Sequence, residues 1–151
     1  MTVDPGSDVV DVAVVVVVRR VDAGWTVLVT KRPTNGYYGG WWEFPGGKME
    51  PSESPTQAGR RELLEETGVR VGVMEQILVH EHVYPDRHVR LHVLVSEASD
   101  AMVVRHLEVE DHRWVAPEAL GTIDLLAANT PIAEAVVKHL LTRPHHRMDV
   151  K

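Results

Sequence analysis

Three glutamates lie close together in the middle of the chain, at Glu62, Glu65 and Glu66. On a helix this spacing places them within an arc of about 100°, while Leu63 and Leu64 point away from that arc. Like charges at these spacings repel each other, so the cluster favours a partner that offsets the repulsion. Carboxylate oxygens are the ligands that hard divalent cations such as Mg²⁺ and Mn²⁺ prefer. The competing interpretation is a solvated acidic face, which is common on exposed helices.

A helix would position these carboxylates, and the sequence marks both of its ends. Ser54 is a good N-cap residue, Pro55 suits the first helical position, and Gln57 completes a capping box. Gly68 suits the left-handed conformation that follows a helix. Ahead of the helix, Gly46-Gly47 lets the backbone turn and present a carbonyl oxygen to an ion. We therefore expect a loop and a helix that together form a cation site.

The rest of the chain predicts a sheet that supports this helix. The apolar run Val12–Val18 (VAVVVVV) lies in a predicted strand over residues 9–19 and fits burial on both faces. Further extended runs are expected at residues 25–31, 41–44, 69–82, 88–96, 102–105 and 112–115, with a stop at Pro45–Gly47 and a last helix at 131–140 capped by Thr130. The order of strands, helix, strands and helix predicts an α+β fold, with a mixed sheet between helices in an α/β/α arrangement.

Composition limits the classes of protein to consider. A chain of 151 residues fits a single domain, 1–151, for which we expect a core at 8–142 and flexible tails at 1–7 and 143–151. The net charge of −6 disfavours direct nucleic-acid binding. There is no cysteine, which excludes thiolate chemistry and suits a cytoplasmic location. The valine run is too short to span a membrane, and the oligomeric state is left open.

The residues around the glutamates resemble a known motif. Nine specified positions match that of the Nudix hydrolases: Gly47, Glu53, Arg61, Glu62, Leu63, Glu65, Glu66, Gly68 and Val69. The resemblance implies a Nudix fold, a site for Mg²⁺ (or Mn²⁺) and the pyrophosphate of a nucleotide, and these metal ligands: Glu62, Glu65, Glu66 and the carbonyl oxygen of Gly46. It also implies that Glu53 orients Arg61 through an ion pair. A carboxylate would take the last proton; Glu62 is our working choice, and the other glutamates remain open.

The segment Trp42–Lys48 (WEFPGGK) resembles the version found in MutT-type Nudix enzymes, which hydrolyse 8-oxo-dGTP to 8-oxo-dGMP and pyrophosphate. Three further segments agree with that resemblance: TKR at 30–32, PDRH at 85–88 and ANTPI at 128–132. The implied substrate-binding residues are Arg32, Phe44, Arg87 and Asn129. An asparagine amide carries donors and an acceptor, so it can read a purine edge. Each residue also has an ordinary alternative: respectively a solvated strand end, a core residue, an exposed turn and a helix cap.

The resemblance predicts a Mg²⁺-dependent pyrophosphohydrolase that clears oxidised purine nucleotides and so acts in DNA repair. Two alternatives remain: an enzyme for another nucleoside triphosphate, such as CTP or a broader set, and a non-catalytic nucleotide-binding module. The intact glutamates disfavour the module.

Two further features concern additional metal ligands. Relatives carry one more catalytic or metal-binding glutamate shortly before a tryptophan, and Glu108, ahead of Trp114, matches best, with Glu110 as the substitute. The nine histidines show no spacing with other ligands that indicates a zinc site.

Overall fold

The computed structural model describes residues 9–22, 24–36, 38–99 and 101–142, so the predicted tails at 1–7 and 143–151 lie outside the described residues. The strands are β1 (Val9–Val21), β2 (Gly24–Lys31), β3 (Trp42–Glu43), β4 (Gly46–Lys48), β5 (Glu75–Tyr84), β6 (Arg87–Glu97) and β7 (Asp111–Val115). The helices are α1 (Pro55–Thr67), α2 (Thr130–Thr142) and the 3₁₀ helices η1 (Pro117–Thr122) and η2 (Ala127–Asn129).

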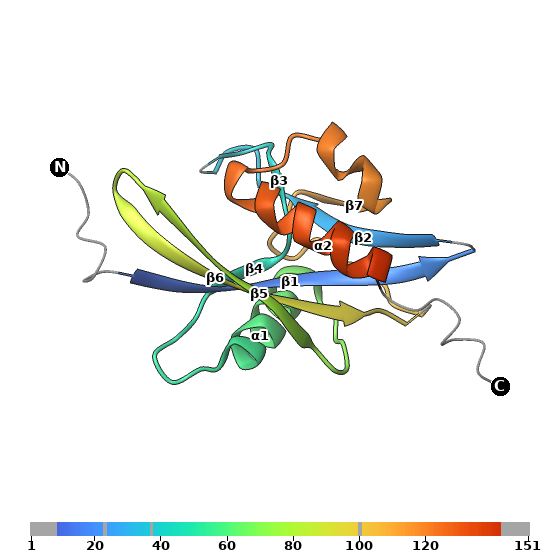
Figure 1. Ribbon diagram of the computed structural model, residues 1–151, viewed down its shortest axis with the longest axis horizontal. Coiled ribbons are helices and arrows are strands. Elements are labelled where there is room, and N and C mark those ends of the chain that lie inside the picture. The colour runs from blue at the N-terminus through green and yellow to red at the C-terminus, as the bar shows by residue number, and fades with distance from the viewer. Residues whose placement is uncertain (1–8, 23, 37, 100, 143–151) are drawn as a thin grey trace.

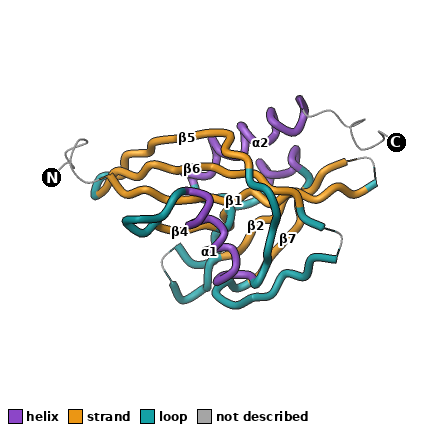
Figure 2. Tube along the Cα trace, turned by 90° about the horizontal axis from the view of Figure 1, so that it is seen from below, coloured by secondary structure: helices purple, strands orange, loops and turns teal. Residues whose placement is uncertain are grey.

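The strands form one mixed sheet that lies between α1 and α2 (Figure 1). The order is β3-β2-β1-β6-β5, with β4 paired to β1 and β7 paired to β2. The pairing of β1 with β6 is parallel and the other pairings are antiparallel. Figure 2 shows α1 across the sheet face nearer the viewer and α2 beyond it. The α+β fold with an α/β/α arrangement is therefore confirmed.

Strand β1 supplies side chains to the core on both sides of the sheet, as the valine run predicts. Val14, Val16 and Val18 pack in the larger apolar cluster, which includes Ile132 of α2. The alternate residues Val15 and Val17 pack in a second cluster with Leu63 of α1. A strand covered on both faces needs apolar residues at consecutive positions rather than at alternate ones. The run of valines is thus explained by the two helical layers.

The glycine pair before α1 forms strand β4, where we expected only a stop. Gly46 pairs with Val14 and Gly47 with Ala13, whereas β1 pairs with β2 only at its far end, from Val18 onward. A Cβ atom on Gly46 would collide with the carbonyl oxygen of Ala13. Glycine is therefore required by this close approach, and β4 takes the place beside β1 that β2 leaves.

Helix α1 has the predicted caps. The Ser54 hydroxyl accepts from the Gln57 amide at 3.1 Å, the Gln57 side chain accepts from Ser54 at 2.9 Å, and Gly68 has a φ of 72°. Gly59 lowers the helix propensity by about 1 kcal/mol relative to alanine, and the structure gives the reason for its presence. A Cβ atom there would lie 2.9 Å from side-chain atoms of both Val15 and Leu94, so the glycine lets α1 pack closely on the sheet.

Three expectations about secondary structure were wrong in detail. Residues 102–105 form no strand; the Arg105 amide instead donates to the Thr67 carbonyl at the end of α1, at 2.9 Å. Thr130 does not cap α2 but lies within it, with φ −62° and ψ −49°, because η2 leads directly into the helix. Strand β5 begins at Glu75 rather than at Val69.

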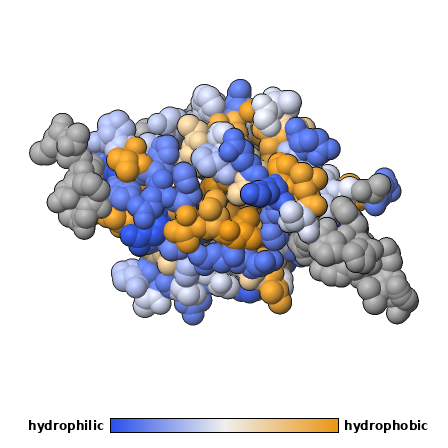
Figure 3. All heavy atoms as spheres, in the orientation of Figure 1, coloured by the Kyte–Doolittle hydropathy of each residue, from blue (hydrophilic) through white to orange (hydrophobic). Residues whose placement is uncertain are grey.

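Neither α1 nor α2 is long and apolar enough to cross a membrane, in the part of the chain that the structure describes. In the orientation of Figure 1, the space-filling view shows apolar residues gathered near the centre of the face, with hydrophilic residues around them (Figure 3).

Candidate active site

Arg61 on α1 forms ion pairs with three acidic residues of the loop and the helix. Its Nε donates to Glu53 Oε2 at 2.7 Å and its Nη2 donates to Glu53 Oε1 at 2.8 Å, so the two side chains form a bidentate ion pair. Its Nη1 lies 2.9 Å from Glu62 Oε2 and 3.4 Å from Glu65 Oε1. The hydrogen bonds from Arg61, together with that from the Glu50 amide, lower the pKa of Glu53 to about 2. Glu53 therefore stays ionised and fixes the direction of the guanidinium.

The Glu62 carboxylate lies directly against the backbone of Gly47. A Cβ atom at Gly47 would come within 2.5 and 2.6 Å of the two Glu62 carboxylate oxygens. Any other residue at this position would therefore displace the carboxylate. The second glycine of β4 is explained by this contact with a side chain of α1.

Glu66 is the most strongly perturbed acid of the group. Burial, a hydrogen bond with Glu62 and the negative charge of Glu43 raise the pKa of Glu66 to about 9, against a smaller lowering by the Gly46 backbone. Glu65, by contrast, has a side chain that is 47% exposed, and its Oε1 lies 3.4 Å from Arg61 Nη1. The structure thus brings Glu62 and Glu66 together against β4 and leaves Glu65 at the rim.

This donor set fits a hard divalent cation. Glu62 and Glu66 share one small volume beside the glycine backbone of β4, with Glu65 one helical turn from Glu62, and their oxygens are the ligand type that Mg²⁺ and Mn²⁺ prefer. A nearby positive ion would favour the ionised form of Glu66 and so oppose the burial and the repulsion that raise its pKa.

A cavity of about 520 Å³ opens beside these carboxylates. All four predicted substrate-binding residues line it: Arg32, Phe44, Arg87 and Asn129. Three predicted metal-site residues line it as well: Gly46, Glu66 and Glu108. Aromatic and apolar neighbours complete the lining, among them Tyr38, Tyr84, Val89 and Leu91. The volume lies within the range of about 300–1,000 Å³ that is usual for small-molecule sites. One continuous cavity therefore joins the acidic cluster to the predicted base-binding residues.

Two of the four predicted substrate-binding residues are held by partners within the site. Asn129 is buried, and its Oδ1 accepts a hydrogen bond from the Phe44 amide at 3.1 Å, so its side chain does not serve as the helix cap of the alternative interpretation. Arg32 is not a solvated strand end either, because its Nη1 lies 3.1 Å from both carboxylate oxygens of Glu43. Phe44 is 3% exposed and belongs to the core as well as to the cavity lining.

Sequence reasoning missed Glu43 and Tyr84 as members of this site. Burial raises the pKa of Glu43, and the charge and hydrogen bond of Arg32 act in the opposite direction. The guanidinium of Arg87 lies 5.0 Å from the centre of the Tyr84 ring, which is a cation–π contact. The signal for Glu43 was present, because it stands between Trp42 and Phe44 in the WEFPGGK segment.

Of the two later glutamates, Glu108 is the one that lines the cavity; Glu110 is not part of the lining. The Glu108 amide donates to the Glu66 carbonyl at 3.1 Å, which ties the loop to the end of α1. The Glu110 amide donates to Lys31 on β2 at 2.9 Å. The geometry favours Glu108.

A family model decides the identity of the fold and the acidic loop-helix. The model for the NUDIX domain matches residues 9–140. The chain belongs to the Nudix family.

Known proteins resemble this chain, some over part of its length and others over most of it. An 8-oxo-dGTP diphosphatase of Proteus vulgaris is 46% identical over 65 residues, which are 43% of this chain and 58% of that protein. A CTP pyrophosphohydrolase of Escherichia coli K12 is 33% identical over 129 residues, which are 85% of this chain and 95% of that protein. The solution structure of the E. coli ORF135 protein has a TM-score of 0.72 at 30% identity, covering 91% of this chain and 95% of that one.

Membership of the Nudix family identifies this protein as a nucleotide pyrophosphohydrolase, an enzyme acting on phosphoanhydride bonds. Nudix enzymes typically use a divalent metal.

Proposed function

We propose that this Nudix enzyme hydrolyses 8-oxo-dGTP to 8-oxo-dGMP and pyrophosphate with Mg²⁺, or Mn²⁺ in its place, and so removes an oxidised purine from the nucleotide pool. The observation that carries the proposal is the single cavity whose lining includes both the predicted base-binding residues Asn129 and Phe44 and the predicted metal-site residues Gly46 and Glu66. A nucleoside triphosphate needs both kinds of lining, because it joins a flat base to a polyanionic tail.

For the metal we assign four ligands in the loop-helix and one in the later loop: Glu62, Glu65, Glu66, the carbonyl oxygen of Gly46, and Glu108. When bound, Mg²⁺ offsets the charge of the phosphates and activates a water molecule. Arg61, held by Glu53, lies between Glu62 and Glu65 and keeps the two carboxylates in place. Its positive charge also reduces the repulsion within the cluster.

In the reaction the oxygen of a water molecule bonds to a phosphorus of the substrate, and the bond from that phosphorus to the bridging oxygen of the leaving pyrophosphate breaks. A carboxylate takes the proton that the water loses. Glu62 is our candidate for this base, since it lies against β4 beside the cavity and its orientation is fixed by Arg61 at 2.9 Å.

The nucleobase of the substrate would lie against Phe44 and form hydrogen bonds with Asn129. Because the Asn129 Oδ1 is held by the Phe44 amide, the orientation of the side chain is fixed and its amino group is the end that can donate to a carbonyl oxygen of the base. Arg32 and Arg87 line the same cavity and supply positive charge in an otherwise acidic protein.

A second candidate is CTP, because the E. coli relative that aligns over 85% of this chain is a CTP pyrophosphohydrolase. Cytosine also presents a carbonyl oxygen, so the asparagine alone does not separate the two substrates. A non-catalytic binding module is disfavoured, because the carboxylates, Arg61 and the two glycines of β4 are all present in a mutually supported arrangement.

A panel assay separates these candidates. Pyrophosphate release is measured from 8-oxo-dGTP, dGTP and CTP, each with Mg²⁺ and with EDTA. We expect the highest kcat/KM for 8-oxo-dGTP and no turnover with EDTA. A preference for CTP would refute the oxidised-purine assignment, and binding without turnover of any nucleotide would refute catalysis.

The role of Asn129 in recognising the nucleobase is tested with Asn129→Ala. The matched control is Asn35→Ala, a substitution in an exposed loop. We expect Asn129→Ala to reduce the ratio of kcat/KM for 8-oxo-dGTP over dGTP, and Asn35→Ala to leave it unchanged. A ratio of rates within one protein is insensitive to a loss of folded fraction, which matters because Asn129 also supports the Phe44 backbone. An unchanged ratio in Asn129→Ala would contradict the assignment.

A further inference from the structure

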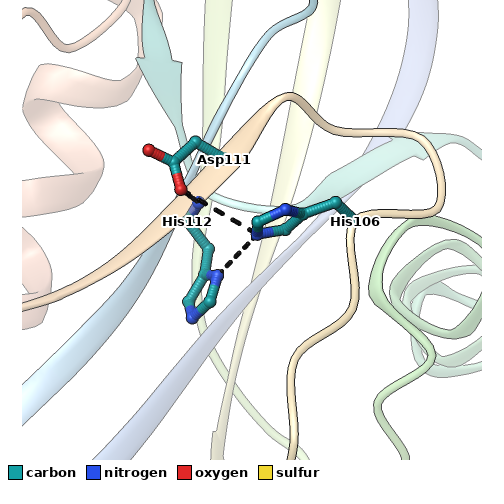
Figure 4. A group of neighbouring side chains, drawn as sticks. All are labelled: His106, Asp111 and His112. Atoms are coloured by element: carbon teal, nitrogen blue, oxygen red, sulfur yellow. Dashed lines mark hydrogen bonds and ion pairs between the residues drawn. The ribbon is translucent and has the colours of Figure 1, made fainter.

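Two histidines and an aspartate meet outside the acidic cluster, at His106, Asp111 and His112 (Figure 4). His106 Nε2 lies 2.8 Å from His112 Nδ1 and 3.9 Å from Asp111 Oδ1. One ligand atom from each side chain lies within 4.8 Å of the others. Sequence reasoning found no zinc spacing, because residues six apart in an irregular loop carry no periodic pattern.

The backbone on both sides of this group is fixed. The Arg105 amide donates to the Thr67 carbonyl at 2.9 Å and the Leu107 amide to the Glu66 carbonyl at 3.1 Å, so the chain around His106 is tied to the end of α1. Asp111 and His112 begin β7, where they pair with Lys31 and Thr30 of β2. The three side chains are therefore presented from two separately supported segments, and little ordering is needed to bring them together.

We propose that His106, Asp111 and His112 bind a transition-metal cation of the zinc class. Imidazole nitrogens with one carboxylate oxygen suit Zn²⁺, whose ligand bonds are about 2.0–2.2 Å long. Ligand atoms around such an ion lie somewhat more than 3 Å apart, so the 2.8 Å pair has to open slightly and the 3.9 Å pair to close slightly. His106 and Asp111 are 41% and 51% exposed, which gives the ion access and leaves a fourth position to water.

This site differs from the acidic cluster in the cation that it selects. Mg²⁺ prefers oxygen ligands and has little affinity for imidazole. Without an ion, the two histidine rings are held together by a hydrogen bond and by an aromatic contact with their centres 5.0 Å apart. The Asp111 Oδ1 also accepts a hydrogen bond from the His112 amide at 2.7 Å, and an ion would replace the hydrogen bond between the rings with bonds to all three residues.

The ion would close a loop that carries an active-site residue. Glu108, which lines the cavity, lies between His106 and Asp111 in the sequence. A cation bound to both ends of this loop restricts its opening and holds Glu108 against the end of α1. The zinc-class site thus joins the two ends of the loop that carries Glu108, and it is separate from the chemistry at the carboxylates.

The test is titration of the full-length protein with ZnCl₂ by calorimetry, with Mg²⁺ in excess so that the carboxylate cluster is saturated. His145 and His146 are replaced by glutamine in every protein compared, because they stand outside the described residues and could also bind zinc. We expect one Zn²⁺ per chain. His106→Gln and His112→Gln should weaken its binding by at least the roughly tenfold that the loss of even an outer-shell partner causes. Asp111→Asn should weaken it less.

The matched control is His80→Gln, in a strand that lies at the other edge of the sheet. It should bind zinc as the parent does. Hydrogen exchange of the segment 105–112 gives a second readout, and Zn²⁺ should slow it in the parent but not in His112→Gln. Equal zinc affinity in the parent and in His106→Gln, or zinc binding without slower exchange of this segment, would overturn the proposal.

Discussion

The raised pKa of Glu66 predicts an unusual pH dependence of stability in the metal-free protein. The pKa of this carboxyl is about 9 in the folded state, against an ordinary value of 4.5. Between these values the folded state holds a proton that the unfolded chain has lost. The stability that Glu66 contributes is therefore full below pH 4.5 and is lost as the pH rises towards 9.

The size of the effect follows from the shift. Each pKa unit corresponds to about 1.4 kcal/mol, which sets a ceiling of about 6 kcal/mol for the whole window. Burial is the main cause of the shift, and Glu62 and Glu43 add to it and titrate together with Glu66, so we expect on the order of a few kcal/mol between pH 5 and 8. Glu53 adds nothing in this window, since its pKa of about 2 makes its contribution disappear only as the pH falls below 4.5.

The measurement is urea unfolding in EDTA at several pH values, for the parent, Glu66→Gln and Glu65→Gln. Glutamine has nearly the volume of glutamate and does not titrate. In Glu66→Gln the free energy of unfolding should therefore decrease less as the pH rises than it does in the parent. Glu65→Gln is the matched control, because the Glu65 side chain is 47% exposed, and it should follow the parent. Excess Mg²⁺ should also flatten the curve of the parent. Parallel curves for the parent and Glu66→Gln would refute the reasoning.

Three other substitutions test the site and its support. Glu65→Gln should lower kcat by orders of magnitude while circular dichroism shows an intact fold, because it removes a ligand charge and little volume; full activity or unfolding would contradict the metal assignment. Gly47→Ala should abolish most activity by displacing the Glu62 carboxylate, whereas Gly72→Ala, where a Cβ atom meets nothing within 4 Å, should retain it. Gly59→Ala should destabilise the protein by about 1–3 kcal/mol through overpacking, less the gain of about 1 kcal/mol in helix propensity; a stabilised variant in urea would show that α1 can move away from the sheet.

Local signals in the sequence predicted α1 well, because its N-cap, first-turn proline and C-terminal glycine act within a few residues of the helix ends. The double-faced burial of β1 was also predictable from its unbroken valines. The sequence did not predict β4, since Gly46-Gly47 looks like a chain break until β1 is placed beside it. Glu43 was missed because its partner Arg32 lies beyond the intervening loop, and only the pairing of β2 with β3 brings the two side chains together. The group around His106 and His112 was missed because residues six apart in an irregular loop carry no periodic pattern.

The parallel pairing of β1 with β6 has a consequence for how the protein reaches its native state. Val9 pairs with His88 and Val18 with Glu97, so about eighty residues separate each pair of partners. A contact of such long range forms slowly. Until residues 88–97 have been synthesised, this edge of the valine strand has no intramolecular partner, and an uncharged stretch of β-branched residues is a template for aggregation. The strand that builds both layers of the core is therefore also the segment that most needs protection in the nascent chain.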